Sequence, residues 1–229
     1  MFADMSGPFT KTLKGNKYIV QVCDNYSHFG IAGFSKERSE FGPWLKMNVL
    51  KKLKGQNINV KYLHCDNAVE NQSTLKEICD EYGIELEYTA PHTPQQNGVV
   101  ERRIAINIQT ASTMMTQAQF LKSAKELLWA EAYNMANNLE NIMVGSAKEE
   151  PPCEKFLNTK SKIYGKLIKF GRVGYVTNRQ RIKAKWQEKS HKMIMVGYAK
   201  NHAADTYRMY NPKTKHIIET YNVKWADWM

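Results

Sequence analysis

Two carboxylates stand where protein folds commonly place metal-binding groups. Glu101 follows a turn-forming segment, 91–98, and the apolar residues after it recur at helical spacing. Glu101 therefore falls in the first turn of a predicted helix, where the positive end of the helix dipole keeps a carboxylate ionised. Asp66 follows the alternating segment 58–65, a predicted strand, and open α/β sheets place their chemistry at the carboxyl ends of strands. Ionised oxygen ligands of this kind suit hard divalent cations.

The placement of Glu101 also has an ordinary explanation, because an acidic residue in a first helical turn is a favourable helix start. A lone aspartate near an N-terminus, such as Asp4, is likewise normally a solvated surface residue. The residues around these carboxylates must therefore decide between a site and a plain surface.

Three segments carry a resemblance to one family. APHTPQQNGVVER, 90–102, resembles the active-site loop and helix of Ty/copia-type retrotransposon integrases. CDNAVEN, 65–71, resembles the block around that family's second catalytic aspartate, although Ala68 stands where the family usually has glycine. DMSGP, 4–8, resembles the segment that opens the family's core domain with its first aspartate.

The resemblance implies a catalytic trio of Asp4, Asp66 and Glu101 that holds two Mg²⁺ or Mn²⁺ ions. It implies DNA strand transfer, in which an element's 3′ end is trimmed and then joined to target DNA. Asp24 is a rival for the first aspartate, but the matching family position is usually a turn residue. Between Asp66 and Glu101 lie 34 residues, one fewer than is usual in the family, and Ala105 replaces a basic residue.

These departures keep two alternatives open. The first is an inactive, integrase-derived protein that only binds nucleic acid. The second is a metal-dependent nuclease of the same fold, which cuts without joining.

Charge is unevenly distributed along the 229 residues, whose net charge is +11. Residues 1–150 hold 16 Lys and Arg against 17 Asp and Glu, whereas residues 151–229 hold 17 against 5. This contrast predicts a near-neutral catalytic part joined to a part that binds a polyanion. No apolar run is long enough to predict a membrane span. Four cysteines without paired spacing indicate reduced, intracellular thiols.

Hydrophobic periodicity predicts two folded parts. Strands are expected at 1–6, 17–23, 29–34, 58–65 and 84–88, and helices over 41–55, 74–83, 98–115 and 124–142. With the resemblance, this order predicts an α/β, ribonuclease-H-like core over 1–144, with a mixed five-stranded sheet and helices on both faces. Residues 145–163 are the predicted linker. Short strands at 169–176, 192–198, 206–210 and 216–223 predict a small, basic all-β barrel over 164–229.

Two groups of residues are expected to contact DNA. The residues flanking the trio are Asn67, Gln95, Gln96, Asn97, Gly98, Arg102 and Arg103. The basic run of the second part contributes Arg179, Arg181, Lys183, Lys185 and Trp186, where an aromatic ring stands among cations. The resemblance further implies element-end and target DNA as partners, a homo-oligomer, and a location in a cytoplasmic particle and the nucleus.

Overall fold

The computed structural model describes residues 1–66, 72–89, 97–144, 150–161, 163, 165–177 and 189–226. The elements in chain order are β1 Phe2–Ser6, β2 Tyr18–Cys23, β3 Gly30–Ser35, η1 Arg38–Glu40, α1 Phe41–Leu45, η2 Lys46–Leu50, α2 Lys51–Gly55, β4 Tyr62–Cys65, α3 Gln72–Tyr82, β5 Glu85–Tyr88, α4 Gly98–Gln117, α5 Lys122–Ile142, α6 Pro152–Leu157, β6 Val173–Thr177, β7 Ser190–Tyr198, β8 Tyr207–Asn211, β9 His216–Thr220 and β10 Val223–Trp225.

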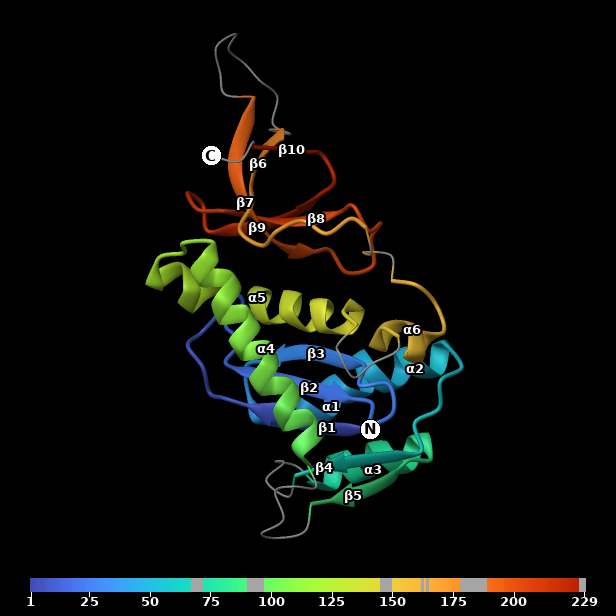
Figure 1. Cartoon of the computed structure of the whole chain (residues 1–229). Coiled ribbons are helices and arrows are strands. Elements are labelled where there is room, and N and C mark those ends of the chain that lie inside the picture. The colour runs from blue at the N-terminus through green and yellow to red at the C-terminus, as the bar shows by residue number, and fades with distance from the viewer. Residues whose placement is uncertain are drawn as a thin grey trace.

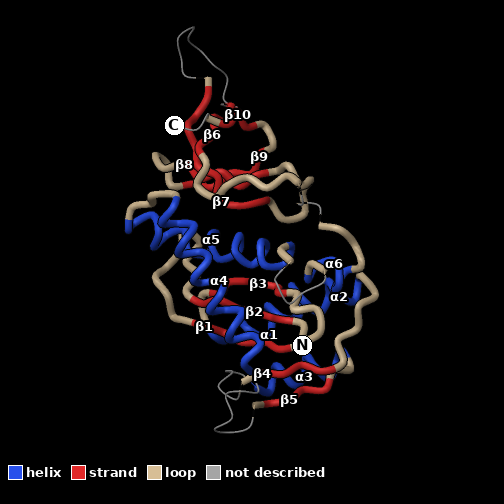
Figure 2. Tube along the Cα trace, viewed as in Figure 1, coloured by secondary structure: helices blue, strands red, loops and turns tan. Residues whose placement is uncertain are grey.

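The first sheet has the strand order β3-β2-β1-β4-β5 (Figures 1 and 2). β1, β2 and β3 pair antiparallel, whereas β4 and β5 run parallel to β1. Parallel neighbours need a crossover connection, which the helices between β3 and β4 and helix α3 provide. This topology is that of a ribonuclease-H-like core and confirms the predicted fold class.

Helices cover both faces of this sheet. Side chains alternate between the faces along a strand, so neighbouring residues of β2 belong to different clusters. Val20 packs in a buried cluster with Phe41 on the side of α1 and α3. Ile19 packs on the other side in a cluster that contains Ala111 of α4 and Leu128 of α5. The two faces therefore have separate hydrophobic cores.

The second sheet is all antiparallel, with the strand order β10-β6-β7-β8-β9. In Figure 1 it lies against α5, on the side away from the first sheet. Met195 of β7 and Met209 of β8 are fully buried in the same cluster as Leu128 of α5. Arg208 of β8 also forms an ion pair with Glu131 of α5, at 2.7 Å between Nη2 and Oε1. Thus α5 is sandwiched between the two sheets.

The strands expected at 58–65 and 169–176 begin later than predicted, as β4 and β6. Two further segments also differ from the expected pattern. The single strand expected at 216–223 is divided into β9 and β10, because the Asn222 amide donates to Thr220 Oγ1 at 3.2 Å and closes a tight turn. The predicted linker contains the short helix α6, whose Phe156 stacks on Phe29 with ring centroids 4.8 Å apart. That contact holds part of this segment against the core.

Over the part of the chain that the structure describes, no helix combines the length and apolar character needed to cross a membrane.

Candidate active site

Asp4 and Asp66 are brought together by the pairing of two parallel strands. The register of β1 on β4 pairs Phe2 with His64 and Ala3 with Cys65, so the next step along both strands brings Asp4 beside Asp66. Ala3 and Cys65 both belong to the buried cluster on the α1 and α3 side. Because side chains alternate along a strand, Asp4 faces the opposite side, where α4 lies.

Glu101 reaches the same region from α4. This helix begins at Gly98, and Glu101 lies exposed in its first turn. Val100 and Ile104 pack against Cys23 of β2 and the ring of Phe2 in β1. The first turn of α4 is therefore held over the strand that carries Asp4, and Glu101 points outward at that edge.

The three carboxylates interact electrostatically. The pKa of Asp4 is raised from 3.8 to about 6, chiefly by burial and also by the charges of Asp66 and Glu101. The Met5 amide, which donates to Asp4 Oδ1 at 2.7 Å, and the charge of Arg38 act in the opposite direction. The charges of Asp66 and Glu101 thus disfavour a negative charge on Asp4 in this fold.

A carboxylate trio of this kind is chemically suited to hard divalent cations, which prefer oxygen ligands and would relieve the repulsion. As the side chains lie, however, no three His, Cys, Asp or Glu residues within the described ranges are close enough to hold one metal ion. The carboxylate oxygens are of the kind that Mg²⁺ and Mn²⁺ prefer. To hold one ion together, the three carboxylates would have to lie closer to one another. The metal site therefore stays a prediction.

Apart from Arg103, the residues predicted to contact DNA divide into three groups. Arg102 is exposed on α4, and Gly98 begins that helix. Asn97 is buried, and its side-chain amide has no hydrogen-bond partner among the described residues. The remaining predicted DNA contacts lie outside the described residues: Asn67, Gln95, Gln96, Arg179, Arg181, Lys183, Lys185 and Trp186.

Arg103 differs from the prediction of a DNA contact. Its side chain is turned inward and the residue is only 6% exposed. Nη2 donates to Asn141 Oδ1 at 2.6 Å and to the Asn137 carbonyl at 3.1 Å, and Nη1 donates to the His28 carbonyl at 3.3 Å. Helical periodicity explains the difference, because Arg103 shares the inward face of α4 with Val100 and Arg102 does not.

Arg103 belongs to a buried polar network that the sequence analysis missed. Gln21 of β2 accepts hydrogen bonds from the Tyr133 hydroxyl at 2.9 Å and from the Asn107 amide at 3.3 Å. It donates to Asn137 Oδ1 at 3.3 Å. The signal available in the sequence was the spacing of Asn137 and Asn141, which places both amides on one face of α5. The network ties α4 and α5 to the sheet.

Comparisons with known proteins find similar sequences over most of the chain. Residues 173–227 match the family model of the retroviral polymerase SH3-like domain. The chain is 29% identical over 228 residues to the retrovirus-related Pol polyprotein from transposon TNT 1-94 of Nicotiana tabacum, covering 97% of this chain and 16% of that protein. It is also 29% identical over 130 residues to the Pol polyprotein from transposon RE1 of Arabidopsis thaliana, covering 57% of this chain and 9% of that protein.

Among solved structures, the catalytic core domain of BIV integrase aligns with a TM-score of 0.48 and 19% identity, over 69% of this chain and 93% of that one. The sequence matches show that the chain is similar to retrovirus-related Pol polyproteins. More particularly, its homologues are the Pol polyproteins of plant transposons, as the sequence resemblance predicted. The chain spans less than a fifth of the length of each of these two relatives.

Proposed function

We propose that this chain catalyses integrase-type DNA strand transfer through Asp4, Asp66 and Glu101. The observation that carries the proposal is the register of β1 on β4, which sets Asp4 beside Asp66, together with the packing of the first turn of α4, which carries Glu101, on β1 and β2. Similarity to retrovirus-related Pol polyproteins from transposons supports it. The chain is further proposed to act on DNA as a homo-oligomer.

In the proposed reaction, a hydroxyl oxygen attacks the phosphorus of a phosphodiester, a new P–O bond forms, and the bond to the leaving 3′ oxygen breaks. The attacking hydroxyl loses its proton and the leaving oxygen gains one. Water as the attacking group trims an end, whereas a 3′-hydroxyl joins two DNAs. When bound, Mg²⁺ or Mn²⁺ would supply Lewis-acid stabilisation of the reacting phosphate.

The chain's own contribution is to position charged oxygen atoms. Asp4 is fixed by its strand and by the Met5 amide, and Glu101 is fixed by the packing of the first turn of α4. Asp66 follows directly after β4 and supplies a third oxygen ligand from an exposed position. Ligand atoms must be deprotonated, so the raised pKa of Asp4 predicts weaker metal binding as the pH falls below about 6.

One observation favours a second candidate, an inactive descendant that only binds nucleic acid. No ready-made group of three metal ligands exists among the described residues. Such a protein would retain the basic second part without requiring the carboxylates to converge.

The experiment that separates the two is a disintegration assay on branched DNA, with Mn²⁺ or with EDTA. Asp66→Asn is the test variant. Asp24→Asn is the matched control, because Asp24 Oδ2 accepts hydrogen bonds from the Ser27 amide and hydroxyl within its own turn. Metal-dependent rejoining that is lost only in Asp66→Asn supports the proposal. Equal activity in Asp66→Asn and the unmodified chain would refute the trio, and no product with DNA binding intact would favour the inactive descendant.

A further inference from the structure

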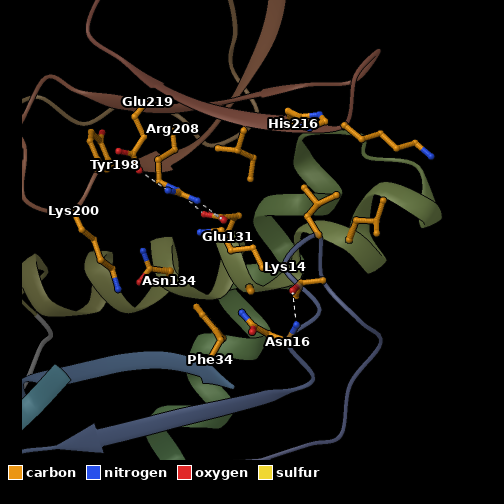
Figure 3. A pocket seen from close by; sticks show the side chains of 16 residues that line it. Lys14, Asn16, Phe34, Glu131, Asn134, Tyr198, Lys200, Arg208, His216 and Glu219 are labelled. Carbon is orange, nitrogen blue, oxygen red and sulfur yellow. Dashed lines mark hydrogen bonds and ion pairs between the residues drawn. The ribbon is translucent and has the colours of Figure 1, made fainter. Parts of the chain in front are cut away.

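A cleft separates the second sheet from the core at one end of α5. Its volume is about 740 Å³. Its walls come from the loop 12–16 between β1 and β2, from α5 at Leu127–Asn134, and from strands β7 to β9 with their connections (Figure 3). Figure 1 places this end of the molecule opposite β4 and β5, which flank the start of α4. The cleft is therefore separate from the carboxylate trio.

The charged lining of the cleft is unbalanced. Arg208 is already neutralised, because it pairs with Glu131 at 2.7 Å and with Glu219 at 2.6 Å. Lys14, Lys200 and Lys215 also line the cleft. None of these three lysines has a carboxylate partner among the described residues. Four cationic side chains thus face two carboxylates, and both carboxylates are occupied.

The charged form of the Lys200 side chain is disfavoured by this excess of positive charge. The residue as a whole is exposed, but Figure 3 shows its side chain extending into the cleft toward α5. Burial of the ammonium lowers the pKa of Lys200, and the charge of Lys52 lowers it further. Arg208 and Lys14 act in the same direction, against the opposing charge of Glu131. An anion bound beside Lys200 would remove this unfavourable interaction.

Asn134 adds a polar group to the lining beside the lysines. It is only 8% exposed, lines the cleft, and lies beside Lys200 in Figure 3. No hydrogen bond to its side chain is present within the described parts of the chain. The NH₂ group of Asn134 can therefore donate to a polar ligand that lies beside Lys200 in the cleft.

We propose that this cleft binds phosphate groups, either along a nucleic-acid strand or on a free polyphosphate. Lysine ammoniums offer hydrogen-bond donors and no acceptors, as does the NH₂ of Asn134, and phosphate oxygens are acceptors. A cleft of about 740 Å³ holds more than one phosphate group, which matches three separated lysines. A nucleic-acid source of these phosphates rests on the proposed function, whereas phosphate binding itself does not.

The test measures binding by the full chain in EDTA, so that the carboxylate trio takes no part. A short labelled DNA oligonucleotide is the first probe, and sodium triphosphate, added as a competitor, is the second. The variants are Lys200→Gln and Lys215→Gln. The matched control is Lys76→Gln, since Lys76 is an exposed residue of α3 on the far face of the core. Circular dichroism verifies that each variant is folded.

The plot of log affinity against log salt concentration has a negative slope. Removing one phosphate contact in Lys200→Gln should make this slope shallower by about 1. Lys76→Gln should leave the slope unchanged. If triphosphate displaces the oligonucleotide effectively, the cleft is a site for free polyphosphates. If the oligonucleotide binds and triphosphate does not displace it, the cleft is a site for a nucleic-acid strand.

Binding of both probes by Lys200→Gln and Lys215→Gln at the level of Lys76→Gln would overturn the proposal. If only the proposed strand-transfer function is wrong, the disintegration assay with Mn²⁺ gives no metal-dependent product, while binding of the phosphate probes in EDTA is unchanged.

Discussion

Replacing Asp4 by asparagine should stabilise the metal-free protein. The folded pKa of Asp4 lies above its ordinary value, so the folded state holds this proton more tightly than the unfolded chain does. The free energy of unfolding therefore falls as the pH rises from about 4 through about 6. Above that range the loss of stability caused by Asp4 has reached its full size. Raising a pKa from 3.8 to about 6 corresponds to at most about 3 kcal/mol. Asparagine keeps the oxygen that accepts from the Met5 amide and carries no charge at any pH.

Solvent screens part of this cost, because Asp4 is only partly buried, and about 1–2 kcal/mol should remain. For a chain of this size, that corresponds to a rise of about 2–8 °C in the melting temperature of Asp4→Asn. The assay is thermal unfolding by circular dichroism in EDTA, at pH 7.5 and at pH 4. The difference between variant and unmodified chain should be present at pH 7.5 and vanish at pH 4.

Metal addition provides the complementary measurement. Mn²⁺ should raise the melting temperature of the unmodified chain, because a ligand that binds only the folded state stabilises it, and it should raise that of Asp4→Asn much less. Asp24→Asn serves as the control, because Asp24 lies in the turn after β2 and its carboxylate bonds to Ser27 within that turn. A melting temperature of Asp4→Asn below that of the unmodified chain at pH 7.5, or an equal shift at both pH values, would refute the electrostatic reasoning.

Three further predictions concern buried or partly buried side chains of the two folded parts. Arg208→Met leaves the partly buried Glu131 with no arginine partner and should cost about 2 kcal/mol, less than a fully buried pair would, measured by urea unfolding. Arg103→Met leaves Asn141 Oδ1 without its charged donor and should cost about 3 kcal/mol in the same measurement. Burial raises the pKa of the Cys65 thiol, so alkylation of this residue in the folded protein at pH 8 should be far slower than in urea, as followed by mass spectrometry.

Each of these has a control and a contrary result. Glu219→Gln changes the more exposed partner of Arg208 and should have a smaller effect than Arg208→Met. Arg102→Met controls for loss of an exposed arginine, and equal stability of Arg103→Met and Arg102→Met would contradict the inward placement of Arg103. Rapid labelling of Cys65 without denaturant would contradict its burial.

Local sequence predicted most elements of both parts because their hydrophobic periodicity is strong. The spacing of Val100 and Ile104 indicated a helix, and Glu101 was assigned to its first turn, as the structure has it. The DNA contact expected of Arg103 was wrong, because its spacing of three from Val100 places it on the inward face of α4, whereas Arg102 lies on the outward face. The turn at Tyr221-Asn222 was also missed, since its hydrogen bond to Thr220 is a side-chain contact that no periodicity reports.

The sequence by itself determined the identities and order of the chemical groups: three carboxylates, a basic second part, and strands and helices in a ribonuclease-H-like order. Tertiary structure alone decided how these groups meet. The pairing of β1 with β4 sets Asp4 beside Asp66, and the network around Gln21 and Arg103 fixes α4 on the sheet. The seating of the second sheet on α5 creates the cleft at Lys200. Periodicity reports which face of an element is buried, whereas these contacts depend on register and packing between segments distant in the chain.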